Sequence, residues 1–175
     1  DIKSKIKDVN YSNPLKWPWP KIDEVIVSPG FSIKEIKPRH IIKKIYEHKI
    51  PIKNEIDLFA RSNPNAKTIG ITGTNGKSTT TAMLGHILRH NGIKTEIGGN
   101  FGKAATSLSD PGGNGFILLE LSSYQLEICS ELKLDAAIIL NISSDHIERH
   151  GSIEKYIEAK MNIAINHDLP VRGDS

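Results

Sequence analysis

One glycine-rich turn limits the possible folds of this chain more than any other feature. The turn, residues 73–79, reads Gly-Thr-Asn-Gly-Lys-Ser-Thr and follows residues 68–71, an apolar segment typical of a buried strand. Residues 78–90 are expected to form a helix. In such a strand–turn–helix unit, the backbone N–H groups of the turn and the positive end of the helix converge on one point. The sequence therefore predicts an α/β fold with an anion-binding turn after a buried strand.

Further apolar segments alternate with helical ones after this turn. Strands are expected near residues 93–97, over 116–119 and over 136–140, and helices over 123–132 and 153–165. These strands are apolar on both faces, which is typical of a parallel sheet covered by helices on both sides. The glycine turn at residues 98–102 is expected to open one more helix.

The first part of the chain indicates a smaller lobe. Three prolines interrupt residues 1–20, where no regular structure is expected. Short strands are expected over residues 24–27 and 50–52, and helices over 38–49 and 55–61. A boundary near Asn54 would divide the chain into domains of residues 1–54 and 55–175.

Composition excludes several classes of protein. Hydrophobic residues make up 38% of the chain and charged residues 25%, as in ordinary globular proteins. No apolar run approaches the roughly 20 residues that cross a bilayer, and residues 1–5 lack the apolar segment of a secretory signal. Cys129, the one cysteine, cannot form an internal disulfide, which fits a cytoplasmic location. The net charge of +3 is small and the basic residues are scattered, so neither nucleic acid nor membrane is expected as a partner.

The glycine-rich turn has the residue types of a nucleoside-triphosphate site. Lys77 would meet the β- and γ-phosphates, and the Ser78 hydroxyl would bind Mg²⁺. Gly73 lies three residues before Gly76, so the turn departs from the usual Gly-x4-Gly-Lys-Ser/Thr spacing. The alternative is an ordinary glycine turn that caps a helix. The expected cofactor-binding residues are Gly73, Thr74, Asn75, Gly76, Lys77, Ser78 and Thr79.

Two other side chains, Glu120 and His146, are candidates for the same site from their positions alone. Glu120 ends a buried strand, where open α/β sheets bind ligands, and its carboxylate would hold Mg²⁺. The alternative for Glu120 is a surface glutamate at a strand end. His146 follows the strand at residues 136–140, on the same sheet edge as Lys77. Lys160 lies on the last helix, and because helical lysines are usually solvated, its position alone assigns it no role.

Several motifs resemble one protein family. Residues 72–79 resemble the shortened phosphate loop of the Mur ligase superfamily, which also includes folylpolyglutamate synthases. Residues 98–102, Gly-Gly-Asn-Phe-Gly, and 119–127, Leu-Glu-Leu-Ser-Ser-Tyr-Gln-Leu-Glu, resemble the branch that adds D-glutamate to UDP-N-acetylmuramoyl-L-alanine. Residues 28–30, Ser-Pro-Gly, resemble a loop of its N-terminal domain. The resemblance implies a partial N-terminal Rossmann-like lobe followed by a truncated central P-loop ATPase domain with a mainly parallel sheet.

The resemblance also implies a reaction and its residues. ATP and two Mg²⁺ ions would convert the muramyl carboxylate into an acyl phosphate, from which the amine of D-glutamate displaces phosphate. Lys77, His146 and Lys160 would act in catalysis, Lys160 in a carbamylated form that supports the second metal ion. The metal ligands implied by the resemblance are Ser78, Glu120, His146 and Lys160. The implied substrate-binding residues are Gly30, Asn100, Ser122 and Gln125.

The chain departs from the three-domain pattern of this family. Its first domain lacks the opening strand, its central domain stops soon after Lys160, and the third domain has no counterpart. Residues 167–175 have no counterpart in the family either. The 175 residues alone are therefore expected to be monomeric and without ligase activity. Two alternatives remain open at this stage, a folylpolyglutamate synthase-like ligase and a non-catalytic nucleotide-binding fragment.

Overall fold

The computed structural model describes residues 12–28, 39–63, 65–143 and 147–165. Its chain divides into two compact units. The first unit comprises residues 1–25 and 32–51, and the second comprises residues 26–31 and 52–175. Gly30 and His146, both expected in the site, lie outside the described residues.

The described residues of the first unit form short helical elements around the buried side chains of Trp19, Ile45 and Ile50. Its 3-10 turns cover Pro14–Lys16 and Trp19–Lys21, and helix α1 covers Arg39–Glu47. Trp19 and Ile45 are buried, and the rings of Trp17 and Trp19 lie 5.6 Å apart. The helix predicted over residues 38–49 is confirmed but ends earlier, because the N–H of Ile50 donates to the carbonyl of Ile45 and closes the last turn.

A two-stranded sheet is formed by β1 (Val25–Val27) and β2 (Ile52–Asn54). The second of these strands begins two residues later than predicted, because the N–H of Ile50 closes α1. Helix α2 (Glu55–Ser62) follows β2 directly, and Asn54 begins it with a capping box. The Asn54 side chain accepts from the N–H groups of Ile56 and Asp57, and the Asp57 carboxylate accepts from the N–H of Asn54.

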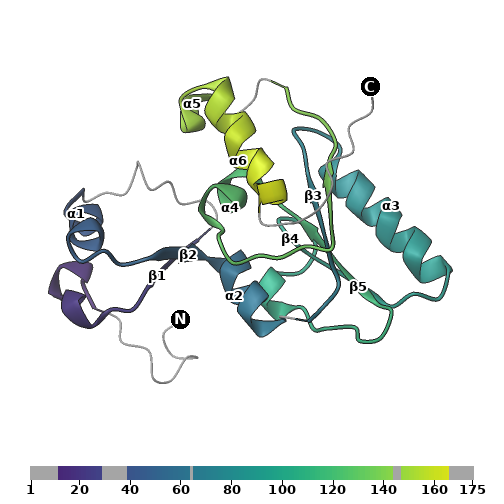
Figure 1. The fold of residues 1–175 in the computed structure, drawn as a ribbon, viewed down its shortest axis with the longest axis horizontal. Helices are drawn as coiled ribbons and strands as arrows, with labels where there is room; N and C mark the ends of the chain where they lie inside the picture. Colours follow the sequence, from purple (N-terminus) through teal and green to yellow (C-terminus); the bar gives the residue numbers. More distant parts are fainter. Residues whose placement is uncertain (1–11, 29–38, 64, 144–146, 166–175) are drawn as a thin grey trace. The chain divides into compact units, whose positions relative to one another are not determined.

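The second unit is built on a four-stranded parallel sheet in the order β4-β5-β3-β6 (Figure 1). These strands are β3 (Thr68–Thr72), β4 (Thr95–Gly99), β5 (Phe116–Glu120) and β6 (Ala136–Ile139). The expected α/β class and parallel sheet are confirmed. Strand β4 starts two residues later than predicted, because the N–H of Ile93 bonds the carbonyl of Leu88 and belongs to the preceding helix end.

Helices cover both faces of this sheet (Figure 1). They include α3 (Lys77–His90), α4 (Ser123–Ile128) and α6 (Ile153–Ile165), while the short α5 (Ile147–His150) packs against α6. Gly85 of α3 faces Ile97 and Leu118 on one side, whereas Gly70 faces Ile163 of α6 on the other. Side chains alternate between the faces along each strand, so one strand supplies both cores. No helix within the described ranges is long and apolar enough to cross a membrane.

Two predicted helices differ from the structure. Helix α4 ends at Ile128 rather than residue 132, because the N–H groups of Ser130 and Glu131 leave the helix and donate to the buried carboxylate of Asp57. The helix expected after residues 98–102 is wrong. Only a 3-10 turn, Ala105–Ser107, follows there, and its buried Ala105 packs in the same core as Ile56.

Candidate functional site

The predicted site residues gather where the parallel strands end. The loop follows β3, Asn100 follows β4, and Glu120 is the last residue of β5. In the strand register Gly99 pairs with Glu120, and Ile71 pairs with Glu120 from the other side. This carboxyl edge of the sheet is where α/β folds bind ligands.

The loop between β3 and α3 exposes N–H groups at the helix start. Gly76 is the N-cap of α3 in a left-handed conformation, with φ of 81°, which favours glycine. Within the described part of the chain, the N–H groups of Gly76, Lys77, Ser78 and Thr79 donate no hydrogen bond to a protein acceptor. Together with the positive end of a 14-residue helix, these N–H groups form a site for an anion.

The first half of the loop is bonded to the protein. The N–H of Thr74 donates to the carbonyl of Asn141 at 2.9 Å, and the N–H of Asn75 donates to the Asn141 side chain at 2.9 Å. The Thr74 hydroxyl lies 3.0 Å from the hydroxyl of Tyr156 and accepts from the N–H of Ser143. The backbone N–H groups of Thr74 and Asn75, expected to bind cofactor, therefore bind protein atoms in this structure.

Lys77 lies folded over its own loop. Its Nζ donates to the carbonyls of Gly73 and Thr74, both at 2.9 Å. Lys160 reaches the same carbonyl from helix α6, with its Nζ 2.8 Å from the oxygen of Gly73. The Lys160 side chain is buried, and its Nζ lies 4.8 Å from the ring centre of Tyr156. The structure thus brings both predicted lysines together at one loop carbonyl.

Glu120 is the centre of a polar group at the base of the loop. Only 1% of its surface is exposed. One carboxylate oxygen accepts from the Ser78 hydroxyl at 2.7 Å, and the other accepts from the Asn100 side-chain amide at 2.8 Å. Charged acceptors make strong hydrogen bonds of this kind. Three predicted residues therefore converge, although Asn100 was expected to contact substrate.

Gly99 allows Asn100 to approach Glu120. Its φ is 96°, and a Cβ atom there would lie 2.4 Å from the carbonyl oxygen of Glu120. That oxygen accepts from the N–H of Asn100 at 2.8 Å. Only glycine fits both the dihedral angle and the close contact.

The residues around Glu120 fit a magnesium ion. The Ser78 hydroxyl and the Glu120 carboxylate are oxygen ligands, which Mg²⁺ prefers, and they are already adjacent. Within the described ranges, no three His, Cys, Asp or Glu side chains cluster as a metal site. This agrees with Mg²⁺, which usually takes one or two protein oxygens and fills the remaining positions with water and phosphate.

Ser122 and Gln125 form a helix cap beside this group. The Gln125 N–H donates to the Ser122 hydroxyl, and the Ser122 N–H donates to the Gln125 side-chain oxygen at 2.9 Å. Gln125 is 1% exposed. These two residues, expected to bind substrate, are therefore engaged with each other at the start of α4.

Two residues at the site were not predicted to act there. Asn141 bonds the loop, and Tyr156 contacts both Thr74 and Lys160. The available sequence signal for Asn141 was its place directly after a buried strand beside β3. Tyr156 lies one helical turn before Lys160, which places both side chains on one face of α6.

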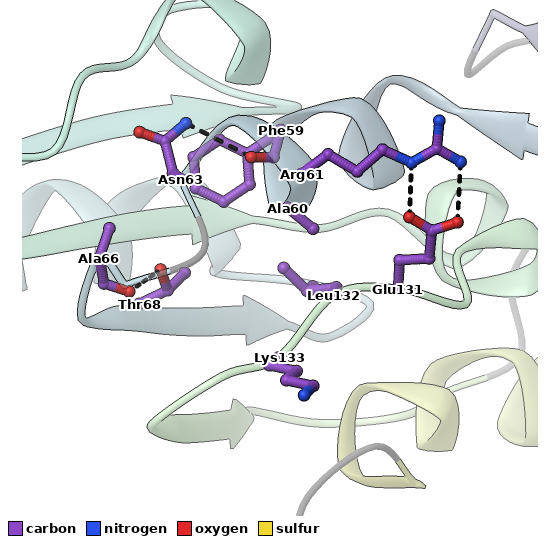
Figure 2. Close-up of a pocket in the computed structure, with 9 residues that line it drawn as sticks. All are labelled: Phe59, Ala60, Arg61, Asn63, Ala66, Thr68, Glu131, Leu132 and Lys133. Carbon is purple, nitrogen blue, oxygen red and sulfur yellow. Dashed lines mark hydrogen bonds and ion pairs between the residues drawn. The ribbon is translucent and has the colours of Figure 1, made fainter.

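A cavity of about 220 Å³ lies away from these residues (Figure 2). Thr68, the first residue of β3, lines this cavity, whereas the glycine loop follows the last residue of β3. Arg61 on its rim holds Glu131 with two hydrogen bonds of 2.6 and 2.8 Å. Figure 2 shows Phe59, Ala60, Asn63, Ala66, Leu132 and Lys133 on its other walls.

The fold and site together define a class of protein. A parallel sheet with a glycine loop, a lysine and a hydroxyl–carboxylate pair at its carboxyl edge is typical of nucleotide-binding α/β domains. The chain belongs to the Mur ligase family, whose middle domain matches residues 71–170. Members of this family are ATP-dependent, amide-forming ligases that use Mg²⁺.

Similar sequences are named UDP-N-acetylmuramoylalanine--D-glutamate ligase. The protein of Caulobacter sp. (strain K31) is 43% identical over 163 residues, which is 90% of this chain and 34% of the relative. That of Wolbachia pipientis wMel is 40% identical over 174 residues, or 99% of this chain and 33% of the relative. The chain thus spans about a third of the length of the curated relatives it matches.

Two solved structures share the fold. One is a UDP-N-acetylmuramate:L-alanyl-gamma-D-glutamyl-meso-diaminopimelate ligase from Neisseria meningitides, with a TM-score of 0.50 and 18% identity over 81% of this chain and 48% of that one. The other is MurF from Acinetobacter baumannii, with a TM-score of 0.50 and 20% identity over 84% of this chain and 40% of that one.

Proposed function

We propose that this chain provides the nucleotide-binding part of a ligase that joins D-glutamate to UDP-N-acetylmuramoyl-L-alanine in peptidoglycan precursor synthesis. One observation carries the proposal. The Ser78 hydroxyl and the Glu120 carboxylate, 2.7 Å apart, lie beside the open N–H groups of Gly76 to Thr79. This arrangement supports a site for a phosphate chain and its metal ion. The name shared by the sequence relatives supports the choice of substrates.

The loop residues would hold the phosphates of ATP. The N–H groups of Gly76, Lys77, Ser78 and Thr79 would donate to phosphate oxygens, while Gly73, Thr74 and Asn75 shape the loop. Lys77 would exchange its two carbonyl acceptors for phosphate oxygens, which are stronger acceptors for an ammonium group. Ser78 and Glu120 would hold Mg²⁺, which supplies charge neutralisation to the phosphates.

The muramyl substrate would bind at the same edge of the sheet. Asn100, Ser122 and Gln125 are the residues proposed to contact it, together with Gly30, which follows β1 in the sequence. A carboxylate oxygen of the substrate would attack the γ-phosphorus of ATP, and ADP would leave. The nitrogen of D-glutamate would then attack the acyl carbon, and phosphate would leave. Catalysis would come mainly from positioning and from neutralising charge.

Lys160 is proposed to act as a carbamate. Its ammonium group would lose one proton, the free amine would bond to the carbon of CO₂, and the nitrogen would then release a second proton. The resulting carbamate is an anion suited to a second Mg²⁺ with His146. Its burial supports this role, because an ammonium group is costly to bury. The proposal also includes a cytoplasmic, monomeric enzyme without a nucleic-acid or membrane partner, for which the single cysteine and the small net charge give support.

The test measures MgATP binding by calorimetry for the wild type, Lys77→Ala and a matched control, Lys94→Ala. Lys94 is exposed and precedes β4, at the amino end of the sheet. We expect Lys77→Ala to weaken binding on the order of 100-fold, because it removes a preorganised charge at the phosphates, and Lys94→Ala to bind as the wild type. Equal affinities for the two variants would contradict the proposed site.

The substrate is tested in the complete ligase. Product formation should require ATP, Mg²⁺, D-glutamate and UDP-N-acetylmuramoyl-L-alanine, and Lys77→Ala should abolish it. Activity with a folate substrate in place of the muramyl precursor would favour a folylpolyglutamate synthase-like ligase instead. MgATP binding by a complete protein that makes neither product would favour a non-catalytic nucleotide-binding role.

A further inference from the structure

We propose that Asn141 is a positioning residue that fixes the first half of the glycine loop, so that only the second half offers N–H groups to a ligand. The inference rests on the proposed function, because it assigns a role toward the nucleotide phosphates.

The Asn141 side chain forms an amide pair with Asn75. Its Oδ1 accepts from the N–H of Asn75 at 2.9 Å, and its Nδ2 donates to the carbonyl of Asn75 at 3.1 Å. The Asn141 side chain therefore bonds both backbone polar groups of Asn75, the N–H and the carbonyl. The backbone carbonyl of Asn141 also accepts from the N–H of Thr74.

The sheet explains why Asn141 reaches the loop. Strand β6 pairs with β3 in parallel, with Thr72 opposite Ile139, and the N–H of Leu140 donates to the carbonyl of Thr72. Asn141, the residue after Leu140 and just beyond the end of β6, therefore lies beside the loop. An asparagine amide carries one acceptor oxygen and one donor nitrogen, so it can bond the N–H and the carbonyl of the same loop residue.

This amide pair divides the loop into two parts. The N–H of Asn75 is occupied by Asn141, whereas no acceptor in the described part of the chain reaches the N–H groups of Gly76 to Thr79. Without the Asn141 side chain, Asn75 would lose both partners and the loop would gain other conformations. A phosphate ligand would then have to order the loop as it binds, which weakens affinity.

Substitutions can remove the pair without opening a cavity, since the Asn141 side chain is exposed. Asn141→Ala removes both side-chain bonds. Asn141→Asp keeps the acceptor for the N–H of Asn75 but loses the donor and adds a negative charge. Asn91→Ala is the matched control, because Asn91 also bonds a backbone carbonyl, that of Ile87, at the far end of α3.

The experiment measures two quantities in the full chain. The first is the hydrogen exchange rate of the Asn75 N–H without nucleotide, and the second is the MgATP dissociation constant. For Asn141→Ala we expect the exchange rate and the dissociation constant each to rise about tenfold, since each reflects loss of ordinary hydrogen bonds. Exchange at Thr74 should rise less, because its acceptor is backbone. Asn141→Asp should keep the slow Asn75 exchange but bind MgATP weakly, and Asn91→Ala should match the wild type in both quantities.

The outcomes separate the two proposals. Failure of the wild type to bind MgATP would count against the proposed function, and the exchange rates would then decide the Asn141–Asn75 amide pair alone. If the wild type binds MgATP and Asn141→Ala binds equally well, the positioning role is overturned, whatever the exchange rates. Fast Asn75 exchange in the wild type would overturn the amide pair itself.

Discussion

Gly99 is the position where the structure makes the sharpest prediction about the site. Gly99 and Gly92 both have positive φ, 96° and 74°, so a side chain strains the backbone at either position. A Cβ at Gly99 would also lie 2.4 Å from the carbonyl oxygen of Glu120, whereas a Cβ at Gly92 meets nothing within 4 Å. Gly92→Ala therefore isolates the cost of the dihedral angle from the cost of the contact.

The two variants should differ in both stability and binding. Gly92→Ala should lower the free energy of unfolding by ~1 kcal/mol through backbone strain alone. Gly99→Ala should lower it by ~3 kcal/mol, because β4 must also move away from β5. That movement separates Asn100 from Glu120, so MgATP affinity should fall as well. Urea unfolding followed by circular dichroism measures the first effect, and calorimetry measures the second. Equal losses of stability in the two variants would refute the argument that Gly99 is required for close approach.

Two further predictions concern the contacts between α2 and the segment after α4. Hydrogen bonds from Arg61 and Lys53 lower the pKa of the Glu131 carboxyl to about 2 from 4.5, so its contribution to stability is complete above pH 4.5 and is lost as pH falls through 2. Glu131→Gln should therefore lower the free energy of unfolding by roughly 1 kcal/mol at pH 7, a figure discounted because the pair is partly solvated. Near pH 2, urea unfolding should show almost no difference between this variant and the wild type. Asp57→Ala should cost about 3 kcal/mol, because it leaves the N–H groups of Ser130 and Glu131 without their buried acceptor; a loss below about 1 kcal/mol in urea unfolding would contradict this.

Much of the second unit could be predicted because its strands are continuous apolar runs and its helices show helical spacing of apolar residues. Helix α6 has the bounds expected from the sequence, Ile153–Ile165, and the buried strands β3, β5 and β6 were each found within one residue of their ends. Uninterrupted apolar runs identify such strands because both faces are covered. The glycine loop could also be predicted from local sequence, because its glycines, lysine and hydroxyl residues are consecutive at positions 73–79.

Contacts between distant segments could not be predicted in this way. Helix α4 stops early because Asp57, more than 70 residues before, binds the N–H groups of Ser130 and Glu131. Asp57 also affects Cys129. Burial, and after it the negative charge of Asp57, raises the pKa of the Cys129 thiol to about 12. The sequence around α4 does not predict a contact with a residue so distant in the chain.

The candidate site also contains both residues that local sequence predicts and residues that only the folded sheet brings together. Residue types placed Lys77, Ser78 and Glu120 at one sheet edge, and the hydrogen bond between Ser78 and Glu120 agrees with that expectation. Asn141, however, acts on Asn75 from 66 residues away. Its amide pair depends on the register of β6 against β3, which only the folded sheet supplies.

The loop presents donors outward because its carbonyls are all engaged inward. The carbonyl of Gly73 accepts from Lys77 and Lys160, and that of Thr74 accepts from Lys77. The carbonyls of Asn75 and Gly76 accept from Asn141 and from the N–H of Thr80. An approaching anion would be repelled by free carbonyl oxygens, so their engagement matters as much as the open N–H groups. The glycines permit this orientation, and Asn141 holds it at Asn75. Lys77 holds the carbonyls of Gly73 and Thr74 until it turns to the phosphates, so a glycine turn without Lys77 and Asn141 would lack the same preference for an anion.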